Sequence, residues 1–290
     1  SVLDNTEKMV PYISECANLG VEVLPPHVNH SAENFTVEDG KVRFGLLAVK
    51  NVSGVFIKAI INEREKNGPF ASFFTFCRRV YGKEFNRRSV EHFIKCGALD
   101  GLGTNRRQML QMMDPIISSL EDDRKHKIDG QIGLFDVGSA FEEVAEPPIP
   151  DVPELPDREK LALEKLTTGL YISGHPMAEY RDMAKKLRCA RIDNLLEADP
   201  QDPSSYRDGA KVDVLVILSS VKKKITKNDT TMAFLEAEDM YGSIEVIVFP
   251  KAYTQYAPFI AEDAIVLIKA RLSVRDDEAP KLLLESIEPA

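Results

Sequence analysis

The sequence predicts a multidomain α+β chain, in which a helical unit is followed by a five-stranded β-barrel. Before Tyr206, apolar residues recur mostly at the spacing of amphipathic helices. From Tyr206 onward they alternate with polar residues, which is the period of β-strands. An acidic segment rich in proline, residues 138–156, interrupts the helical part and predicts an extended linker.

The first 40 residues predict a mixed segment ahead of the main helices. Helix-like residues up to Gly20 are followed by "VEVLPP", a short strand that its prolines end. The stretch "FTVEDGKVRFGL" alternates around Asp39 and Gly40, a pair that favours a β-hairpin turn. The next stretch, "LLAVKNVSGVFIKAIINEREKNG", predicts two helices joined by a tight turn.

The "NVSG" turn in this stretch resembles the turn of a helix-hairpin-helix motif. Such a turn directs backbone N–H groups and the N-terminus of the next helix at a DNA phosphate, without reading the base sequence. Five residues are therefore predicted to contact duplex DNA here: Lys50, Asn51, Ser53, Gly54 and Lys58. Asn51 and Ser53 occupy positions where such turns usually have glycine, so an ordinary hairpin packed in a core is the alternative.

A second hairpin is predicted in "IKCGALDGLGTNRRQ", which is richer in glycine than the first. Four nearby arginines are also predicted to contact duplex DNA: Arg87, Arg88, Arg106 and Arg107. Residues 41–110 hold 14 Lys and Arg against 5 Asp and Glu, although the whole chain has a net charge of -9. This segregation predicts a polyanionic partner for the segment. For each single arginine, a solvated helix face is the alternative.

The stretch "DGQIGLFDVG" places two large apolar residues on a loop between charged segments that cannot bury them. Gln131, Leu134 and Phe135 form a Q-x-x-L-F pattern. Leu and Phe can fill an apolar pocket of a partner protein and supply most of the binding energy, while Gln fixes the register. The alternative is a loop that packs Leu134 and Phe135 onto its own domain.

Residues 157–205 predict a helical connector between the linker and the barrel. "DREKLALEKLTTGLYI" reads as a helix with Asp157 as its N-cap and three leucines on one face: Leu163, Leu166 and Leu170. "AEYRDMAKKLR" predicts a second helix.

Five alternating segments between Tyr206 and the end fit a small Greek-key barrel of the OB type. A basic hairpin and two aromatic residues suit a groove for single-stranded DNA, because bases stack on aromatic rings beside a cationic path. The predicted single-strand site comprises Lys222, Lys223, Lys224, Lys227, Phe234 and Phe249. The alternative is that both phenylalanines fill the barrel core.

The sequence carries no catalytic constellation: it lacks a phosphate-binding GxxxxGK[ST] loop, a nucleophile elbow and a set of carboxylates suited to two Mg²⁺ ions. Glu236, Glu238 and Asp239 are predicted to form a solvated edge. No metal site is expected. The scattered cysteines predict buried thiols: Cys16, Cys77, Cys96 and Cys189. No apolar run reaches the roughly 18 residues that a membrane span requires.

Several stretches, taken in order, resemble the later portion of the bacterial replicative DNA polymerase III alpha subunit. They are "VLPPHVNHSAENFTVEDGKVRFGLLAVKNVSG", "GQIGLFD", "TTGLYISGHPMAEY" and "KKKITKNDTTMAFLEAEDMYGSIEVIVFP". The resemblance implies an α+β order of domains: 1–40 as the end of a fingers domain, 41–128 as a helix-hairpin-helix unit, 129–137 as a sliding-clamp-binding loop, 138–156 as a linker, 157–205 as a connector and 206–290 as an OB-fold domain.

The resemblance also implies a role in DNA replication. The parent enzyme is a DNA-directed DNA polymerase that uses Mg²⁺ on palm-domain aspartates, and we expect those aspartates to precede this fragment. The fragment alone is expected to be inactive and to need no cofactor. It would bind duplex DNA and single-stranded template, contact the sliding clamp through Gln131, Leu134 and Phe135, and work in the cytoplasm. Contacts with other replisome subunits would lie in missing regions. A stand-alone protein-interaction module is the alternative function.

Overall fold

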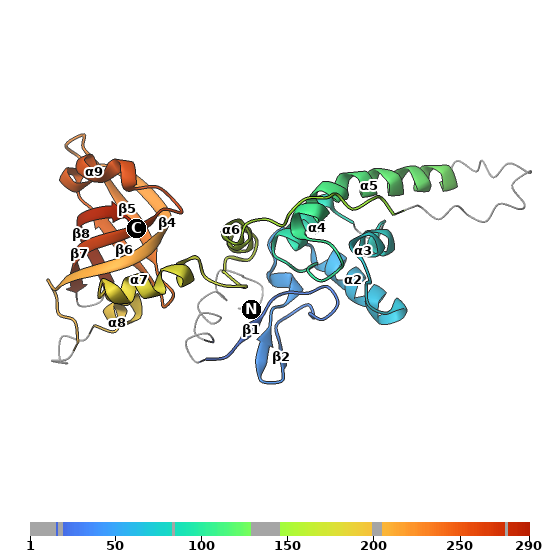
Figure 1. Cartoon of the computed structure of the whole chain (residues 1–290), viewed down its shortest axis with the longest axis horizontal. Helices are drawn as coiled ribbons and strands as arrows, with labels where there is room; N and C mark the ends of the chain where they lie inside the picture. The colour runs from blue at the N-terminus through green and yellow to red at the C-terminus, as the bar shows by residue number, and fades with distance from the viewer. Residues whose placement is uncertain (1–15, 17–19, 83–84, 129–145, 199–204, 276–277) are drawn as a thin grey trace, which may run out of the picture. The chain divides into compact units, whose positions relative to one another are not determined.

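The computed structural model describes residues 16, 20–82, 85–128, 146–198, 205–275 and 278–290. The chain forms two compact units, Ser1–Gly174 and His175–Ala290 (Figure 1). Each has its own hydrophobic core. The first unit combines a small sheet with helices, and the second is built around a closed β-barrel. The division after Gly174 splits the predicted connector, residues 157–205, between the two units.

The first unit begins with a three-stranded sheet of β1 (Val23–Leu24), β2 (Thr36–Glu38) and β3 (Lys41–Arg43), in the order β1-β3-β2. β2 and β3 are antiparallel and are joined by Asp39 and Gly40, whose φ angles are 49° and 78°. The predicted hairpin is confirmed, because positive φ at both central residues suits the twist of the strands. β3 also pairs with β1, so the sheet crosses the predicted boundary at residue 40.

Among the described residues, five helices follow the sheet up to Ile128: η2 (Leu46–Ala48), α2 (Gly54–Asn67), α3 (Phe73–Val80), α4 (Arg87–Lys95) and α5 (Arg106–Ile128). The helix predicted before "NVSG" is wrong, since only the single 3₁₀ turn η2 forms there. Backbone groups of this stretch bond to distant parts of the chain. The N–H of Leu46 donates to the carbonyl of Ala32, and the N–H of Lys50 donates to that of Thr167.

The core of the first unit gathers aromatic side chains from successive helices. Phe56 of α2 stacks on Phe93 of α4 with ring centroids 6.2 Å apart, and both are fully buried. Cys77 and Cys96 are also buried as free thiols, which confirms the prediction for these two. Burial raises the pKa of Cys96 to about 12. Cys16 and Cys189 are only half-buried, so they depart from it.

The described part of the predicted linker, residues 146–156, is packed against the first unit. The carbonyls of Pro150 and Val152 accept from the side chains of Gln108 (2.9 Å) and Asn105 (3.1 Å), and Leu155 is buried. This stretch is extended as predicted, but it is docked along the start of α5. The described stretch therefore belongs to the first unit.

Helix α6 (Asp157–Thr168) differs from its prediction in two ways. Pro156 is the N-cap, and Asp157 is instead paired with Lys160 at 2.8 Å. The buried face is polar and comprises Glu164, Thr167 and Thr168. The expected leucine face is wrong, because Leu166 is 61% exposed.

The second unit starts with η3 (Pro176–Tyr180), α7 (Arg181–Lys186) and α8 (Ile192–Leu196). The barrel then comprises β4 (Lys211–Ile225), β5 (Thr231–Glu238), β6 (Ser243–Val248), α9 (Pro250–Tyr256), η4 (Ala257–Phe259), β7 (Ile265–Arg275) and β8 (Glu278–Pro289). The strands close in the order β4-β5-β6-β8-β7, with β6 and β8 parallel and the other pairs antiparallel. This five-stranded Greek-key barrel confirms the predicted OB fold.

Candidate nucleic-acid interface

The two residues that replace glycine in the first hairpin turn, Asn51 and Ser53, each have a structural role there. Asn51 adopts φ 60°, a left-handed conformation that asparagine tolerates better than most residues. Ser53 is the N-cap of α2, and its hydroxyl accepts from the N–H of Phe56 at 3.2 Å. Both departures from the glycine pattern therefore preserve the turn that precedes the helix.

The N-terminus of α2 presents N–H groups that the helix itself cannot satisfy. Ser53 pairs the N–H of Phe56, whereas those of Gly54 and Val55 have no acceptor in the described part of the chain. Lys50, Asn51 and Lys58 are exposed around this end. The positive end of a 14-residue helix with nearby lysines can bind a phosphate group.

Helix α4 places further polar groups beside the first hairpin. The hydroxyl of Ser89 donates to the carbonyl of Asn51 at 3.0 Å, and the Asn51 amide lies 3.4 Å from Nε2 of His92. Burial, Lys95 and Arg88 lower the pKa of His92, which favours the neutral ring. Arg88 is exposed and forms no ion pair within the described residues. It adds positive charge near the open end of α2.

Two other predicted arginines are engaged with carboxylates. The Arg87 guanidinium donates to both carboxylate oxygens of Asp114 (2.8 and 3.0 Å) and also to Glu91. The hydrogen bond with Asp114 raises the pKa of Arg87. Arg107 lies 4.0 Å from Glu159 and is partly exposed. Both side chains still reach solvent, but each already has an acidic neighbour.

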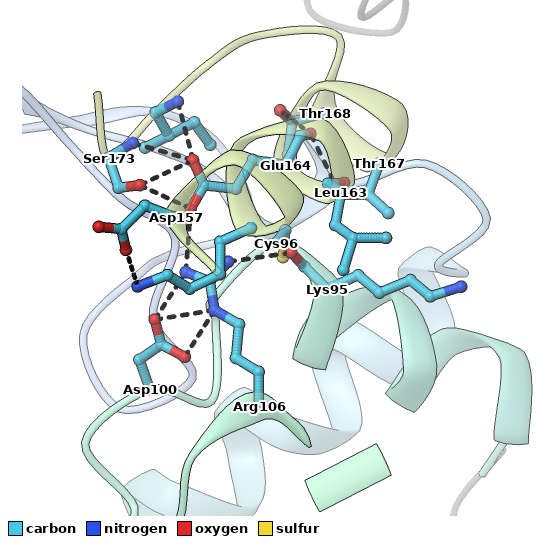
Figure 2. Close-up of polar contacts among 12 residues, drawn as sticks. Lys95, Cys96, Asp100, Arg106, Asp157, Leu163, Glu164, Thr167, Thr168 and Ser173 are labelled. Carbon is cyan, nitrogen blue, oxygen red and sulfur yellow. Dashed lines mark hydrogen bonds and ion pairs between the residues drawn. The ribbon is translucent and has the colours of Figure 1, made fainter. Parts of the chain in front are cut away.

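Arg106 has a structural role, which corrects its predicted place in the duplex site. Its side chain is 5% exposed and pairs with Asp100 (2.7 Å) and Glu164 (2.9 Å), the latter only 1% exposed. Glu164 also accepts from the N–H group of Ser173 (Figure 2) and from that of Ile172. Burial opposes the charge on Arg106, but these two carboxylates raise its pKa above the ordinary value. The guanidinium cannot reach a phosphate from this position.

Gly97 makes room for the Arg106 network. Its φ is +79°, and a Cβ at this position would lie 2.3 Å from a guanidinium nitrogen of Arg106 and 2.8 Å from a carboxylate oxygen of Asp100. The glycine that suggested a phosphate-binding turn therefore serves an internal ion pair.

The N-terminus of α5, at the second hairpin, is occupied by Glu154 of the docked segment. Its carboxylate accepts from the backbone N–H groups of Arg106 (3.1 Å) and Arg107 (3.4 Å). Burial opposes ionisation, yet the hydrogen bonds from Leu155, Arg106 and Arg107 hold the pKa of Glu154 below its usual value. A carboxylate thus fills the position that a phosphate would take at this helix end.

The barrel presents a mixed cationic and aromatic face on β4, β5 and β6. In the strand register Lys222 is opposite Phe234, which is opposite Ile247, and Lys224 is opposite Met232. The intervening positions, Ala233 and Val248 among them, are buried in the core. Phe234 therefore lies on the outer face and is half-buried. This outward row, named the stacking face here, can support a base beside a cationic path.

The other predicted barrel residues lie away from this row. Phe249 follows β6 as the N-cap of α9 and is 49% exposed, so it is outside the core and also off the strands. Lys223 is opposite the buried Ala233, and its ammonium lies 6.0 Å from the Tyr253 ring centroid. Lys227 is exposed in the turn between β4 and β5.

Asp239 is not part of a solvated edge. Its carboxylate accepts from the N–H groups of Ile192 (2.9 Å), Tyr241 (2.7 Å) and Gly242 (2.9 Å), which joins α8 to the turn after β5. Burial raises the pKa of Asp239, although those hydrogen bonds oppose the shift. Glu236 is exposed as predicted.

Some predictions concern residues that the structure does not describe. Gln131, Leu134 and Phe135, the predicted clamp-binding residues, lie outside the described ranges. Within those ranges, no cluster of three or more His, Cys, Asp or Glu residues is arranged to hold a metal ion. None of the described helices has the length and apolar character to cross a bilayer.

Comparisons with known proteins give the same two-part division. Residues 20–109 match a family model described as a helix-hairpin-helix motif, and residues 212–290 match an OB-fold nucleic acid binding domain. DNA polymerase III subunit alpha of Bacillus subtilis is 35% identical over 96% of this chain, and that of Mycobacterium tuberculosis is 34% identical over 96%. The chain is related to DNA polymerase III subunit alpha.

The similarity to DNA polymerase III subunit alpha covers 24% of the Bacillus subtilis protein and 23% of the Mycobacterium tuberculosis protein. The chain thus spans about a quarter of the length of these curated relatives. One chain of a solved replication protein A heterotrimer bound to single-stranded DNA aligns with 35% of this chain and with 78% of its own length. The two are 16% identical in sequence, and the TM-score is 0.27.

Three residues that matter most to the second hairpin escaped the sequence analysis: Asp100, Glu154 and Glu164. Each is an acid in a chain rich in acids, so composition does not single it out. Only Glu164 has an indirect signal in the sequence. The stretch "TTGLYISGHP", which resembles the polymerase family, supplies the Ser173 hydroxyl and the Ile172 N–H that contact Glu164.

Proposed function

We propose that this chain is the DNA-holding and clamp-binding portion of a replicative DNA polymerase alpha subunit. The observation that carries the proposal is the first hairpin, where Lys50 and Lys58 are exposed on either side of the open N-terminus of α2, and where the exposed Arg88 is next to Ser89, which contacts Asn51. A helix end with unpaired N–H groups and several cations suits the phosphates of duplex DNA, without base readout. The match to a helix-hairpin-helix model over residues 20–109 supports this assignment.

The barrel would guide single-stranded template along the stacking face. Phe234 offers a ring for base stacking, and Lys222 and Lys224 follow the same side of the neighbouring strand. Such stacking contributes about 1–3 kcal/mol per base. The match to an OB-fold nucleic acid binding domain supports the choice of ligand.

The remaining roles follow from the relatives and the sequence pattern. Gln131, Leu134 and Phe135 would tether the polymerase to the sliding clamp, and loss of clamp binding in Leu134→Ala/Phe135→Ala tests that role. Polymerase chemistry and its Mg²⁺ would belong to the part of the relatives that this chain does not match, so we expect no nucleotide incorporation by the chain alone. The setting would be the cytoplasmic replisome of a bacterium.

Two lysines of α2 test the duplex-binding role. Lys58 lies in the second turn of α2, and Lys66 is exposed in its last turn. Lys58→Ala should weaken binding to a DNA duplex and reduce the slope of log affinity against log salt by about 0.9, the value for one lost phosphate contact. Lys66→Ala should leave both near wild type in fluorescence anisotropy titrations.

Equal effects of the two substitutions would overturn the proposed duplex site. Absence of salt-dependent DNA binding by the wild-type chain would instead favour the alternative of a protein-interaction module, since contacts between apolar surfaces depend weakly on salt.

A further inference from the structure

The second unit carries a basic surface outside the stacking face. It comprises exposed cations on α7, on the turn after it and on the outer side of β4 and β7: Arg181, Lys185, Lys186, Arg188, Lys211 and Lys269. We name this surface the α7 ridge. None of these residues belongs to the predicted single-strand site.

Helix α7 is fixed to the barrel, so its cations have defined positions. Met177 of the preceding η3 is buried against Leu215 and Ile217 of β4. At the end of α7, the N–H of Cys189 donates to the carbonyl of Ala184 at 2.9 Å. The N–H of Ala190 then donates to the carbonyl of Asp213 at 2.7 Å, which attaches the helix end to β4.

The cations of α7 continue onto the barrel wall. Asp213, which receives the end of the α7 segment, is opposite Lys269 in the β4–β7 register. Lys211 lies two residues earlier on the same strand and therefore points to the same side of the sheet. The ridge thus follows β4 from α7 toward the start of the strand.

The ridge cations have no acidic partner among the described residues, because none of the six forms an ion pair there. The adjacent Arg271, by contrast, is paired with Glu285 at 2.6 Å. Arg181 and Lys185 are spaced i, i+4 and lie along one side of α7, and Arg188 lies in the turn after the helix, where its φ is 57°. Arg181 and Lys185 are about 6 Å apart along the helix axis, so the helix can present cations to more than one phosphate of a nucleic-acid strand.

We propose that the α7 ridge binds the phosphate backbone of single-stranded DNA as a second contact surface of the barrel unit. β4 connects the two surfaces: its first half adjoins the ridge, and Lys222 and Lys224 of its second half border the stacking face. η3 covers Leu215 and Ile217 of β4 between the two surfaces, so a strand that leaves the stacking face would pass over η3 to reach the ridge cations. The choice of DNA as the partner rests on the proposed function of the barrel.

The test compares two charge reversals of equal size in the full 290-residue chain. Lys185→Glu/Arg188→Glu alters the ridge, and Lys66→Glu/Lys251→Glu alters two exposed lysines outside it. The probe is a labelled oligothymidine of about 30 nucleotides, longer than the roughly 4–16 that one OB fold covers. The ridge variant should bind at least about tenfold more weakly, with a salt slope reduced by about 1.4 for two lost contacts.

A third variant separates this proposal from the function on which it depends. Phe234→Ala should weaken binding while leaving the salt slope unchanged, because it removes stacking and no charge. If Phe234→Ala weakens binding but the ridge variant matches its control, the ridge proposal fails and the barrel function stands. If the wild-type chain does not bind the strand at all, both fail. If the ridge variant binds DNA as tightly as the wild-type chain does, the surface would be assigned to an acidic protein partner.

Discussion

The two hairpins of the first unit were both predicted to bind phosphate, but the helix that follows each turn has a different group at its N-terminus. The first, glycine-poor hairpin leaves the N–H groups of Gly54 and Val55 without an acceptor in the described chain. The second, glycine-rich hairpin has Glu154 on its helix N-terminus and Arg106 buried beneath it. Glycine content is therefore a poor guide to phosphate binding here, since glycine also makes room for an internal ion pair.

The difference assigns separate tasks to the two hairpins. The second hairpin joins α4, α5 and α6 through the network of Arg106, Asp100 and Glu164, and it joins the docked segment through Glu154. That network holds α4, whose Ser89 contacts Asn51 of the first hairpin. The second hairpin thus supports the first, which faces solvent.

Substitution of Arg106 should have the largest effect on this comparison. Arg106→Ala leaves Glu164 buried without its cation, and breaking a buried ion pair typically costs about 3–5 kcal/mol. Arg88→Ala removes an exposed arginine and should change unfolding free energy by less than about 0.5 kcal/mol, while weakening duplex binding. Denaturant unfolding followed by far-UV circular dichroism measures the first quantity. Equal stability of the two variants would contradict the assigned roles.

Two glycines of the second hairpin test whether Gly97 is needed to make room for the Arg106 ion pair. Gly97 and Gly103 both have φ near +80°, but only Gly97 has side-chain atoms within 4 Å of an added Cβ. Gly103→Ala should cost about 1–2 kcal/mol for the left-handed conformation alone. Gly97→Ala should cost clearly more, because it also displaces Arg106 or Asp100. Thermal unfolding of both variants measures this difference. A smaller loss of stability in Gly97→Ala than in Gly103→Ala would contradict the role given to Gly97.

Acid sensitivity of the Glu154 contact should be the smallest effect. Its pKa is lowered in the folded chain from an ordinary value of 4.5, so the ionised form stabilises the fold at neutral pH. That contribution fades as pH falls below about 4.5 and through the lowered folded pKa. Glu154→Gln should therefore be less stable than wild type at pH 7 and should approach it near pH 3. Glu146→Gln, an exposed change in the same segment, serves as the control.

Local patterns predicted most elements correctly where short-range physics decides the outcome. The Asp39-Gly40 hairpin and the five barrel strands follow from turn chemistry and from alternation, both of which act over a few residues. The helix expected before "NVSG" failed because its N–H groups bond to distant carbonyls, of Ala32 and Thr167. The leucine face predicted for α6 was wrong because the helix instead buries Glu164, which pairs with the buried Arg106.

The sequence by itself determined the order of the domains, the strand alternation of the barrel and the residue types able to bind DNA. Only the tertiary structure decided which of those residues are free to do so. Arg88 and Arg106 are the same amino acid at the starts of neighbouring helices, α4 and α5, yet one is exposed and the other is enclosed by two carboxylates. Those partners come from positions 6 and 58 residues away. A charge's availability depends on what surrounds it in space, and no local pattern encodes a neighbour at such a distance.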